Sequence, residues 1–306
     1  LDSKISQREQ WTSKLGFILA AAGSAVGLGN LWGFAYRASQ GGGAAFVVLY
    51  ILIVLIVCLP VFVAEMALGR SSMASSLLAP VKLGGKNWYP LGILFFIAPL
   101  GIASYYSVIM GWTADTLFHS LFFGLPKNLG EAENFFGSIS SGSSVLLGHL
   151  LSLLLTAFIV SSGIKRGIEK VTKYFMPILF IILVVLAIWA TTLSGAWEGY
   201  KTFLLKFDFA ELRNPQTIRN AFTQAFFSLS LGIGIMVTYA SYLNKKSNLP
   251  KLSISVASLD TLVGLMAGLI TFPIVLTFGL SEAISESTVG ALFISIPTGL
   301  GSYGAA

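Results

Sequence analysis

Long apolar segments alternate with short polar ones along most of the chain. Several of these segments reach the length of a membrane-spanning helix, since about 20 apolar residues cross roughly 30 Å of hydrocarbon. None shows the ten-residue alternation of a transmembrane β-barrel. The pattern predicts an all-α, multi-pass membrane protein with seven spans, at residues 14–38, 43–69, 88–123, 144–163, 172–193, 217–243 and 253–279.

Composition and charge support this class and give an orientation. Hydrophobic residues make up 55% of the chain and charged residues 10%, far from the composition of a soluble domain. The basic residues are scattered through short loops, so the net charge of +6 does not indicate nucleic-acid binding. An N-terminus in the cytoplasm places most of them inside, as the positive-inside rule requires. We therefore expect a multi-pass protein of the cell membrane. In this orientation six basic residues lie outside: Arg37, Lys127, Lys201, Lys206, Arg213 and Arg219.

Two apolar segments contain helix-breaking residues near their middle. The first reads GSAVGLGNLWGF over residues 23–34, and the sixth reads FFSLSLGIGIM over residues 226–236. Close helix packing explains the pair Gly23 and Gly27, but it does not explain a buried Asn30. Paired interruptions in two successive repeats are typical of secondary transporters, where unwound backbone lines a midplane binding site. Helix N-termini there attract anions and free carbonyls bind cations, which suits a zwitterion with sodium.

Several ordered motifs resemble the neurotransmitter:sodium symporter family, whose bacterial members include amino-acid transporters. They are REQW (8–11), GSAVGLGNLW (23–32), EMALGR (65–70), YYSVIMGW (105–112), GIKRGIEKVTKYFMP (163–177) and FFSLSLGIGIMVTYASY (226–242). The resemblance implies an inverted-repeat fold with discontinuous first and sixth helices. Residues 1–193 would form the first five-helix repeat. Residues 194–306 would hold an extracellular connection, the sixth and seventh helices and the start of an incomplete second repeat, without the later helices.

The resemblance also implies two sites for sodium, which would be transported together with the substrate. The expected ligands at the first site are the backbone carbonyl of Ala25, the side-chain carbonyl of Asn30 and the hydroxyl of Ser228. Asp260 falls where a seventh-span ligand is expected, and an acid within a span is usually functional. Gly23 and Val26 would give carbonyls to the second site.

The implied substrate is an amino acid or a related small zwitterion. Its carboxylate would lie near the amides of Leu28 and Gly29, beside the sodium ion, with the Tyr106 hydroxyl donating to it. The full set of expected substrate contacts is Ser24, Ala25, Gly27, Leu28, Gly29, Ile102, Tyr106, Phe227, Ser230 and Ile233.

Other residues are expected to act in gating or support. Arg8 and Trp11 match an inner-gate pair, although the positive-inside rule and interfacial anchoring explain them equally well. Phe227 and Arg37 are expected at an outer gate. Gly33 stands where the family usually has a gate arginine, which Arg37 would replace one turn later. Glu65 is expected to bond the unwound sixth segment, with a helix-end salt bridge to nearby Arg70 as the alternative.

Two other functions remain open, and a third is not expected. A proton-coupled transporter of the same architecture would use Asp260 as its titrating group. A truncated, non-transporting homologue would lack part of the machinery. An intramembrane hydrolase would need Ser24 or Ser230 beside His119 or His149. Since the predicted spans place the histidines near the outer face and the serines at mid-depth, we do not expect an enzyme. The oligomeric state is left open.

Overall fold

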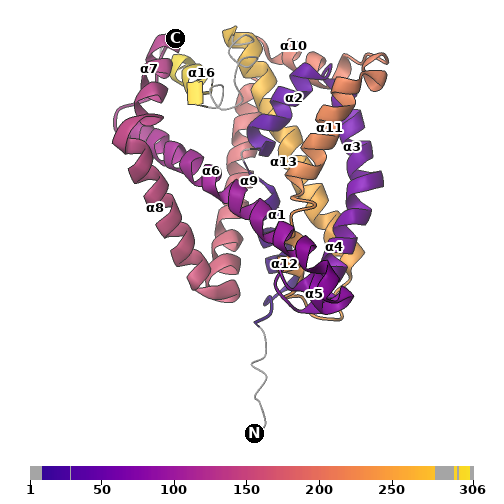
Figure 1. Ribbon diagram of the computed structural model, residues 1–306. Coiled ribbons are helices and arrows are strands. Elements are labelled where there is room, and N and C mark those ends of the chain that lie inside the picture. Colours follow the sequence, from indigo (N-terminus) through magenta and orange to yellow (C-terminus); the bar gives the residue numbers. More distant parts are fainter. Residues whose placement is uncertain (1–8, 28, 280–292, 295, 304–306) are drawn as a thin grey trace.

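The computed structural model describes residues 9–27, 29–279, 293–294 and 296–303 (Figure 1). All regular structure in these residues is helical, because a helix satisfies its own backbone groups where water is absent. The helices of the predicted spans are α1 (Lys14–Ala25), α2 (Phe34–Gln40), α3 (Ala44–Ile53), α4 (Leu59–Ser72), α6 (Tyr89–Phe122), α8 (Gly142–Ser161), α9 (Lys170–Ala190), α11 (Pro215–Ser228), α12 (Ile235–Ala240) and α13 (Leu249–Phe278).

Shorter helical segments connect these helices or extend them. The short α-helices are α5 (Ala79–Gly84), α7 (Leu129–Ile139), α10 (Ala196–Tyr200) and α16 (Ile296–Tyr303). The π-helical turns are η1 (Gly29–Gly33), η2 (Val54–Cys58), η4 (Ile164–Glu169) and η5 (Lys201–Leu205), and the 3-10 turns are η3 (Lys86–Trp88) and η6 (Glu211–Arg213). Because η2 joins α3 to α4 without a gap, these elements form one long helix.

Four continuous helices in the described residues have the length and apolarity to cross a bilayer. They are Ala44–Ser72, Lys86–Phe122, Ile164–Ala190 and Leu249–Phe278. The pair Lys14–Ala25 and Gly29–Gln40, bent by 66°, forms a fifth candidate. The fourth and sixth predicted ranges are also helical, but their helices are shorter, so the number of spans stays a prediction.

One predicted boundary is wrong. We expected the fifth span to begin at residue 172, but the helix begins at Ile164 with η4. The basic residues of this stretch suggested a loop. A helix emerging into water tolerates such charges, and the side chain of Glu9 accepts hydrogen bonds from the amides of Ile164 (2.9 Å) and Lys165 (3.0 Å) at its start.

Both predicted interruptions are present. The helix α1 ends at Ala25, Val26 is extended, and helical structure resumes at Gly29. In the sixth range α11 ends at Ser228 and α12 begins at Ile235. The turn between them has positive φ at Ser230 (54°), Gly232 (80°) and Gly234 (74°). Glycine adopts this conformation without strain, so the two glycines let the chain leave the helix.

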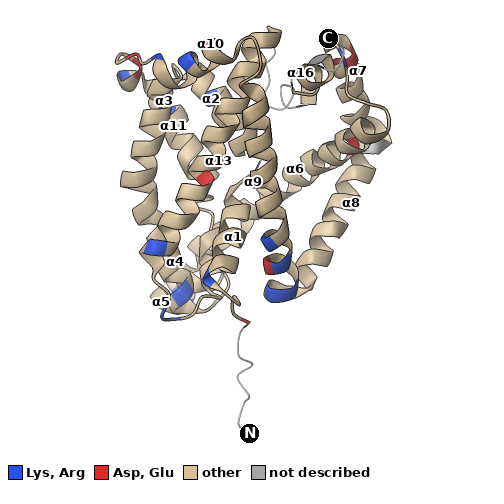
Figure 2. Ribbon diagram, turned by 180° about the vertical axis from the view of Figure 1, so that it is seen from behind, with Lys and Arg blue, Asp and Glu red and all other residues tan. Residues whose placement is uncertain are grey.

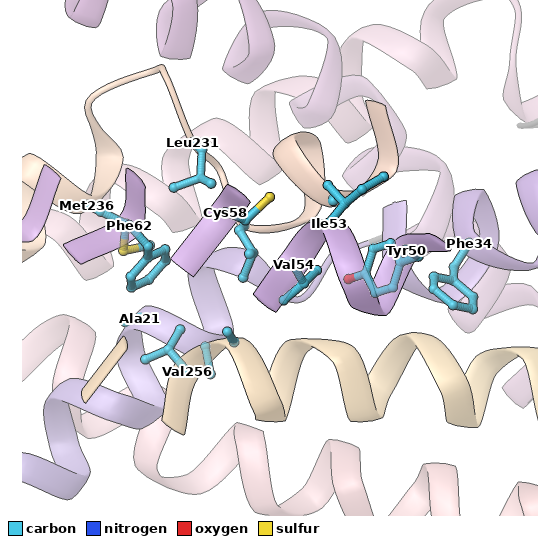
Figure 3. Packing of buried hydrophobic residues seen from close by; sticks show 14 of the residues in the cluster. Ala21, Phe34, Tyr50, Ile53, Val54, Cys58, Phe62, Leu231, Met236 and Val256 are labelled. Atoms are coloured by element: carbon cyan, nitrogen blue, oxygen red, sulfur yellow. The ribbon is translucent and has the colours of Figure 1, made fainter. Parts of the chain in front are cut away.

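The main hydrophobic core surrounds α13, which contacts α1, α2, α4, α9 and α10. Figure 3 shows Tyr50, Ile53, Val54 and Phe62 of the long α3–α4 helix on one side of this core. Small residues allow close contact, since a Cβ on Gly268 would lie 2.1 Å from the ring of Phe203. The core therefore fixes the first, second and sixth ranges around one central helix.

The helices α6 and α8 form a separate pair at the side of this core (Figure 1). They cross at Gly111 and Gly148, where a Cβ on Gly111 would lie 2.7 Å from the backbone of Gly148. Away from this crossing their surfaces are largely apolar and exposed, as at Phe118 and Phe158. Apolar exposure of this extent suits contact with lipid or with further helices.

Charged residues gather at the two ends of the molecule (Figure 2). An exception lies midway along α13, which has one acidic residue, Asp260. This carboxyl group is completely buried. A buried acid at mid-depth directs attention to the region where the two interrupted helices meet α13.

Candidate functional site: a cavity between two interrupted helices

A cavity of about 580 Å³ lies between the two interrupted ranges and α6. It is lined by Ser24, Ala25, Gly27, Gly29, Asn30, Pro99, Ile102, Ala103, Tyr106, Thr223, Phe226, Phe227, Ser228, Ser230, Leu231, Ile233 and Ile235. Every described residue of the expected substrate set is therefore brought together here. Leu28 lies outside the described residues.

Two aromatic side chains stand over the glycines of the first interruption. A Cβ on Gly29 would lie 2.9 Å from the ring of Phe227, and one on Gly27 would lie 3.8 Å from the Tyr106 hydroxyl. At Gly29 a larger side chain would collide with the aromatic wall. Glycine thus keeps the backbone near the hydroxyl of Tyr106, where an anionic group could bind both.

A polar cluster of Asn30, Ser228, Asp260 and Tyr50 lies at one edge of the cavity. The Asn30 amide donates to Ser228 Oγ (2.7 Å) and to Asp260 Oδ1 (2.6 Å). Ser228 donates to Asp260 Oδ2 (2.6 Å), and the Tyr50 hydroxyl donates to the same oxygen at 3.4 Å. All four residues are at least 99% buried. The first interruption, α11 and α13 thus converge on one carboxylate.

The donor set of this cluster fits a small hard cation. The hydrogen-bond donors around Asp260 in the described residues are neutral, and burying an ionised carboxylate without a counter-charge is costly. Carboxylate, hydroxyl and carbonyl oxygens are the ligands that such cations prefer. A cation beside Asp260 would offset its charge.

The orientation of Asn30 differs from the one we expected. Its carbonyl oxygen accepts a hydrogen bond from the amide of Gly27 (3.1 Å), and its NH₂ group faces Asp260. A 180° turn of the amide would direct the carbonyl oxygen toward a cation beside Asp260. In the present arrangement Asn30 acts as a donor that ties the first interruption to α13.

The residues expected at a second cation site lie on the other side of α1. A Cβ on Gly23 would lie 3.1 Å from the sulfur of Met176 in α9. Val26 follows the end of α1, and its N–H donates to the carbonyl of Ala22. Neither residue lines the cavity, so the structure separates this pair from the first cluster.

The segment before α1 is bound to α12 and to η4, which leads into α9. The Trp11 indole donates to the carbonyl of Tyr239 (3.0 Å) and stacks on its ring. The amide of Thr12 donates to Glu169 (2.9 Å), and its hydroxyl bonds the same carboxylate. Together with Glu9 on η4, these contacts link α12 and α9 through residues 9–12. Arg8 lies outside the described residues.

Glu65 of α4 accepts a hydrogen bond from the amide of Gly232 (2.6 Å), in the turn between α11 and α12. The alternative salt bridge with Arg70 is not formed, because the Arg70 guanidinium donates to the carbonyl of Ser247 (2.6 Å). The carboxylate of Glu65 therefore anchors the second interruption.

The side of the cavity away from the N-terminus holds Arg37 and Gln224. The Arg37 guanidinium donates to the side-chain oxygen of Gln224, whose NH₂ group donates to the carbonyl of Gly29 (3.0 Å). Sequence reasoning missed Gln224, as it missed Tyr50. The available signal was the four-residue spacing from Gln224 to Ser228, which places both on one face of a helix.

The remaining ionisable candidates do not form a catalytic site. His149 contacts the Ser107 hydroxyl (3.0 Å) between α6 and α8, and His119 contacts the carbonyl of Gly124 (3.2 Å). Neither histidine lines the cavity that holds Ser24 and Ser230. One carboxylate oxygen of Asp115 is buried without a hydrogen-bond partner in the described residues.

The geometry defines a helical protein that has several helices of membrane-spanning length and apolarity, with a cavity beside two interrupted helical ranges. Sequence comparison then gives its family. The profile described as "Sodium:neurotransmitter symporter family" matches residues 8–135 and 131–297, so the chain belongs to this family. It is a family of transporters and not of enzymes.

Individual relatives agree with this assignment. The chain is 37% identical to the uncharacterized sodium-dependent transporter YhdH of Bacillus subtilis, with 95% of this chain and 65% of the relative aligned. It is 39% identical to an uncharacterized sodium-dependent transporter of Methanocaldococcus jannaschii, with 96% and 62% aligned. The crystal structure of MhsT in complex with L-phenylalanine is similar, with a TM-score of 0.87, 40% identity and coverage of 96% of this chain and 67% of that one. The chain spans less than two thirds of the length of these two sequence relatives.

Proposed function

We propose that the protein is a sodium-coupled symporter that carries an amino acid or a related small zwitterion across the cell membrane by alternating access. The observation that carries the proposal is the buried carboxylate of Asp260. It accepts hydrogen bonds from Asn30 of the first interrupted range and Ser228 of the second, and both of these residues line the cavity. Family membership and the complex of MhsT with L-phenylalanine support the substrate class.

Each group has a defined part in this proposal. Sodium binds Asp260, Ser228 and the turned carbonyl of Asn30, together with the carbonyl of Ala25. The substrate carboxylate lies at Gly29 beside the ion, and the Tyr106 hydroxyl donates to it. Because opposite charges attract at short range in a buried site, each ligand raises the affinity for the other. The sodium gradient then drives substrate uptake.

The proposal extends to the whole architecture. Residues 1–193 form one five-helix repeat with a cytoplasmic N-terminus, and residues 194–306 begin a second repeat of opposite orientation. Gly23 and Val26 contribute carbonyls to a second sodium site. The two interruptions occupy equivalent places in the repeats, which is where secondary transporters bind their substrates.

Proton coupling through Asp260 is the alternative, because a carboxyl group within a span could carry a proton in place of a sodium ion. The two kinds of coupling differ in the gradient that drives uptake.

Thermal unfolding of the purified full-length protein tests the proposal. Each standard amino acid is added in sodium chloride and in potassium chloride, and we expect stabilisation by at least one amino acid in sodium alone. Asp260→Asn should raise the sodium concentration needed by about tenfold or more, or ~1.4 kcal/mol. Ser255→Ala, on the same helix, is the control. Equal stabilisation in both salts would contradict sodium coupling.

A further inference from the structure

A second cavity, of about 370 Å³, lies toward the end of the molecule away from the N-terminus. Figure 1 shows α2, the turn before α3 and the last turns of α13 at this end. The cavity is lined by Ala35, Ser39, Gly42, Gly43, Thr202, Lys206, Asp208, Glu211, Thr271, Phe272, Val275 and Leu276. None of these residues lines the central cavity, the one between the two interrupted ranges. The second cavity is therefore a separate space, of a size that holds a small organic molecule.

The turn between α2 and α3 brings the connection that follows η5 against this cavity. A Cβ on Gly43 would lie 2.0 Å from the carbonyl oxygen of Thr202, and one on Gly42 would lie 2.7 Å from Cγ of Glu211. Both glycines have positive φ, 72° at Gly42 and 61° at Gly43, a conformation that other residues rarely adopt. Because the two glycines permit this close approach, Thr202 and Glu211 become part of the cavity wall.

A buried hydroxyl group in this wall lacks a hydrogen-bond partner. Thr271 of α13 is 4% exposed, and its hydroxyl makes no hydrogen bond within the described residues. Other threonines in helices donate to the carbonyl one turn earlier, as Thr113 and Thr116 do. A buried hydroxyl without a partner is costly. A polar group of a ligand in the cavity would supply the missing partner.

The charged side chains of the lining are not paired with one another. The ion pair within the described residues joins Lys201 to Glu198, and neither residue lines the cavity. The lining itself carries one ammonium group, on Lys206, and two carboxylates, on Asp208 and Glu211. This excess of negative charge favours a cationic ligand.

Glu211 is the acid best suited to such a ligand. Its side chain is half-buried, and its Oε2 accepts hydrogen bonds from the Asn214 amide (2.9 Å) and the Thr217 hydroxyl (2.5 Å). Both donors are neutral, so they leave the charge of the carboxylate uncompensated, and an ammonium group would offset it. Phe272 and Val275 line the same cavity and offer apolar surface to the carbon part of a ligand.

We propose that the second cavity binds a small organic ammonium ion with an apolar part. The Glu211 carboxylate accepts from the ammonium group, the Thr271 hydroxyl is a second acceptor, and the carbon part lies against Phe272 and Val275. A ligand bound in this way contacts α13 and the connection after η5 together, and so holds these two elements in place. The inference goes beyond the proposed function, since neither sodium nor the central cavity takes part in it.

Calorimetric titration of the purified full-length protein tests the chemical class of the ligand. The probes are phenethylammonium and phenylacetate, which carry the same ring with opposite charges, in potassium chloride without sodium or amino acids. We expect saturable binding of phenethylammonium alone, with a Kd about tenfold higher in Glu211→Gln and in Thr271→Val, because each change weakens or removes an acceptor for a charged donor. Glu133→Gln, at an exposed position of α7, is the control and should bind like the wild type. An unchanged Kd in both Glu211→Gln and Thr271→Val would overturn the proposal.

Two variants with a larger ring locate the ligand. Leu276→Trp fills the second cavity from a residue that is 40% exposed, so that the core is not disturbed, and should abolish binding. Ile102→Trp fills the central cavity in the same way and should leave the Kd unchanged. Absence of saturable binding, equal binding of phenylacetate, or loss of binding in Ile102→Trp and not in Leu276→Trp would each contradict the inference. These outcomes do not depend on sodium-driven uptake, so failure of the proposed function would be seen separately.

Discussion

At the scale of single residues, buried polar groups connect parts of the chain that are far apart in sequence. Asp260 receives hydrogen bonds from three other elements, and Glu65 receives one from the turn that interrupts the sixth range. In a region without water each unpaired donor is costly. These carboxylates therefore determine where the broken backbone can lie.

Replacing Glu65 tests this role. Glu65→Ala leaves the Gly232 amide without its acceptor, and we expect a loss of about 1–3 kcal/mol in stability. Glu65→Gln keeps an acceptor oxygen and should lose less. Thermal unfolding of both variants checks that Glu65→Gln is more stable than Glu65→Ala. A Glu65→Ala protein as stable as the wild type would show that the contact does not hold the turn.

At the scale of elements, α4 and α12 make a close contact of backbone against backbone. A Cβ on Gly69 of α4 would lie 2.1 Å from the carbonyl oxygen of Val237 in α12. There is no flexible side chain to move aside. The position of α12 therefore depends on the absence of a side chain at residue 69.

Gly69→Ala should separate α4 from α12 and cost about 1–3 kcal/mol, the usual effect of overpacking. Gly137→Ala is the matched control, because a Cβ at Gly137 in α7 would meet nothing within 4 Å. Alanine there should be neutral or stabilising by about 0.4–1 kcal/mol. Equal unfolding temperatures for the two variants would contradict the close approach.

The segment before α1, residues 9–12, gives a prediction for pH. Hydrogen bonds from the amides of Lys165 and Ile164 lower the pKa of the Glu9 carboxyl. A lowered pKa means that the contact contributes its full stability above the ordinary value of about 4.3 and loses it as the pH falls through the lowered value. We expect a fluorescent probe at exposed residue 10 to report a docked segment, unchanged between pH 8 and pH 6 and released in acid.

Glu9→Gln should reduce the docked fraction at pH 7, because an amide oxygen is a weaker acceptor than a carboxylate. Part of the docked population should remain, since Glu169 also holds this segment through Thr12. If Glu9→Gln leaves the probe signal at neutral pH unchanged, the carboxylate does not hold the segment on η4.

The lengths of the apolar segments and the positions of the glycines made the helices largely predictable. Both interruptions were predictable because a glycine pair near the middle of a span usually marks a break in the helix, and Gly232 and Gly234 do adopt positive φ. The start of the fifth helix was not, since charges at a helix end resemble a loop in the sequence. Gln224 and Tyr50 were missed because an apolar range does not show which of its polar residues faces the neighbouring helix. The orientation of the Asn30 amide depends on contacts that no pattern encodes.

At the scale of the whole molecule, contacts that hold the interrupted ranges lie on both sides of the cavity. On the side of the N-terminus Trp11 binds the carbonyl of Tyr239, and on the other side Arg37 binds Gln224. The cavity and Asp260 lie between them. The alternating access that we propose would need separate contacts of this kind at each side, which open in turn.

Uptake by the full-length protein in proteoliposomes tests the central claim most directly. A labelled amino acid that stabilises the protein is supplied outside, with a sodium gradient directed inward. We predict accumulation above the outside concentration that disappears when the sodium gradient is dissipated, and a strong reduction in Asp260→Asn. Accumulation that is equal in potassium chloride, or that follows an imposed pH gradient instead, would contradict the account.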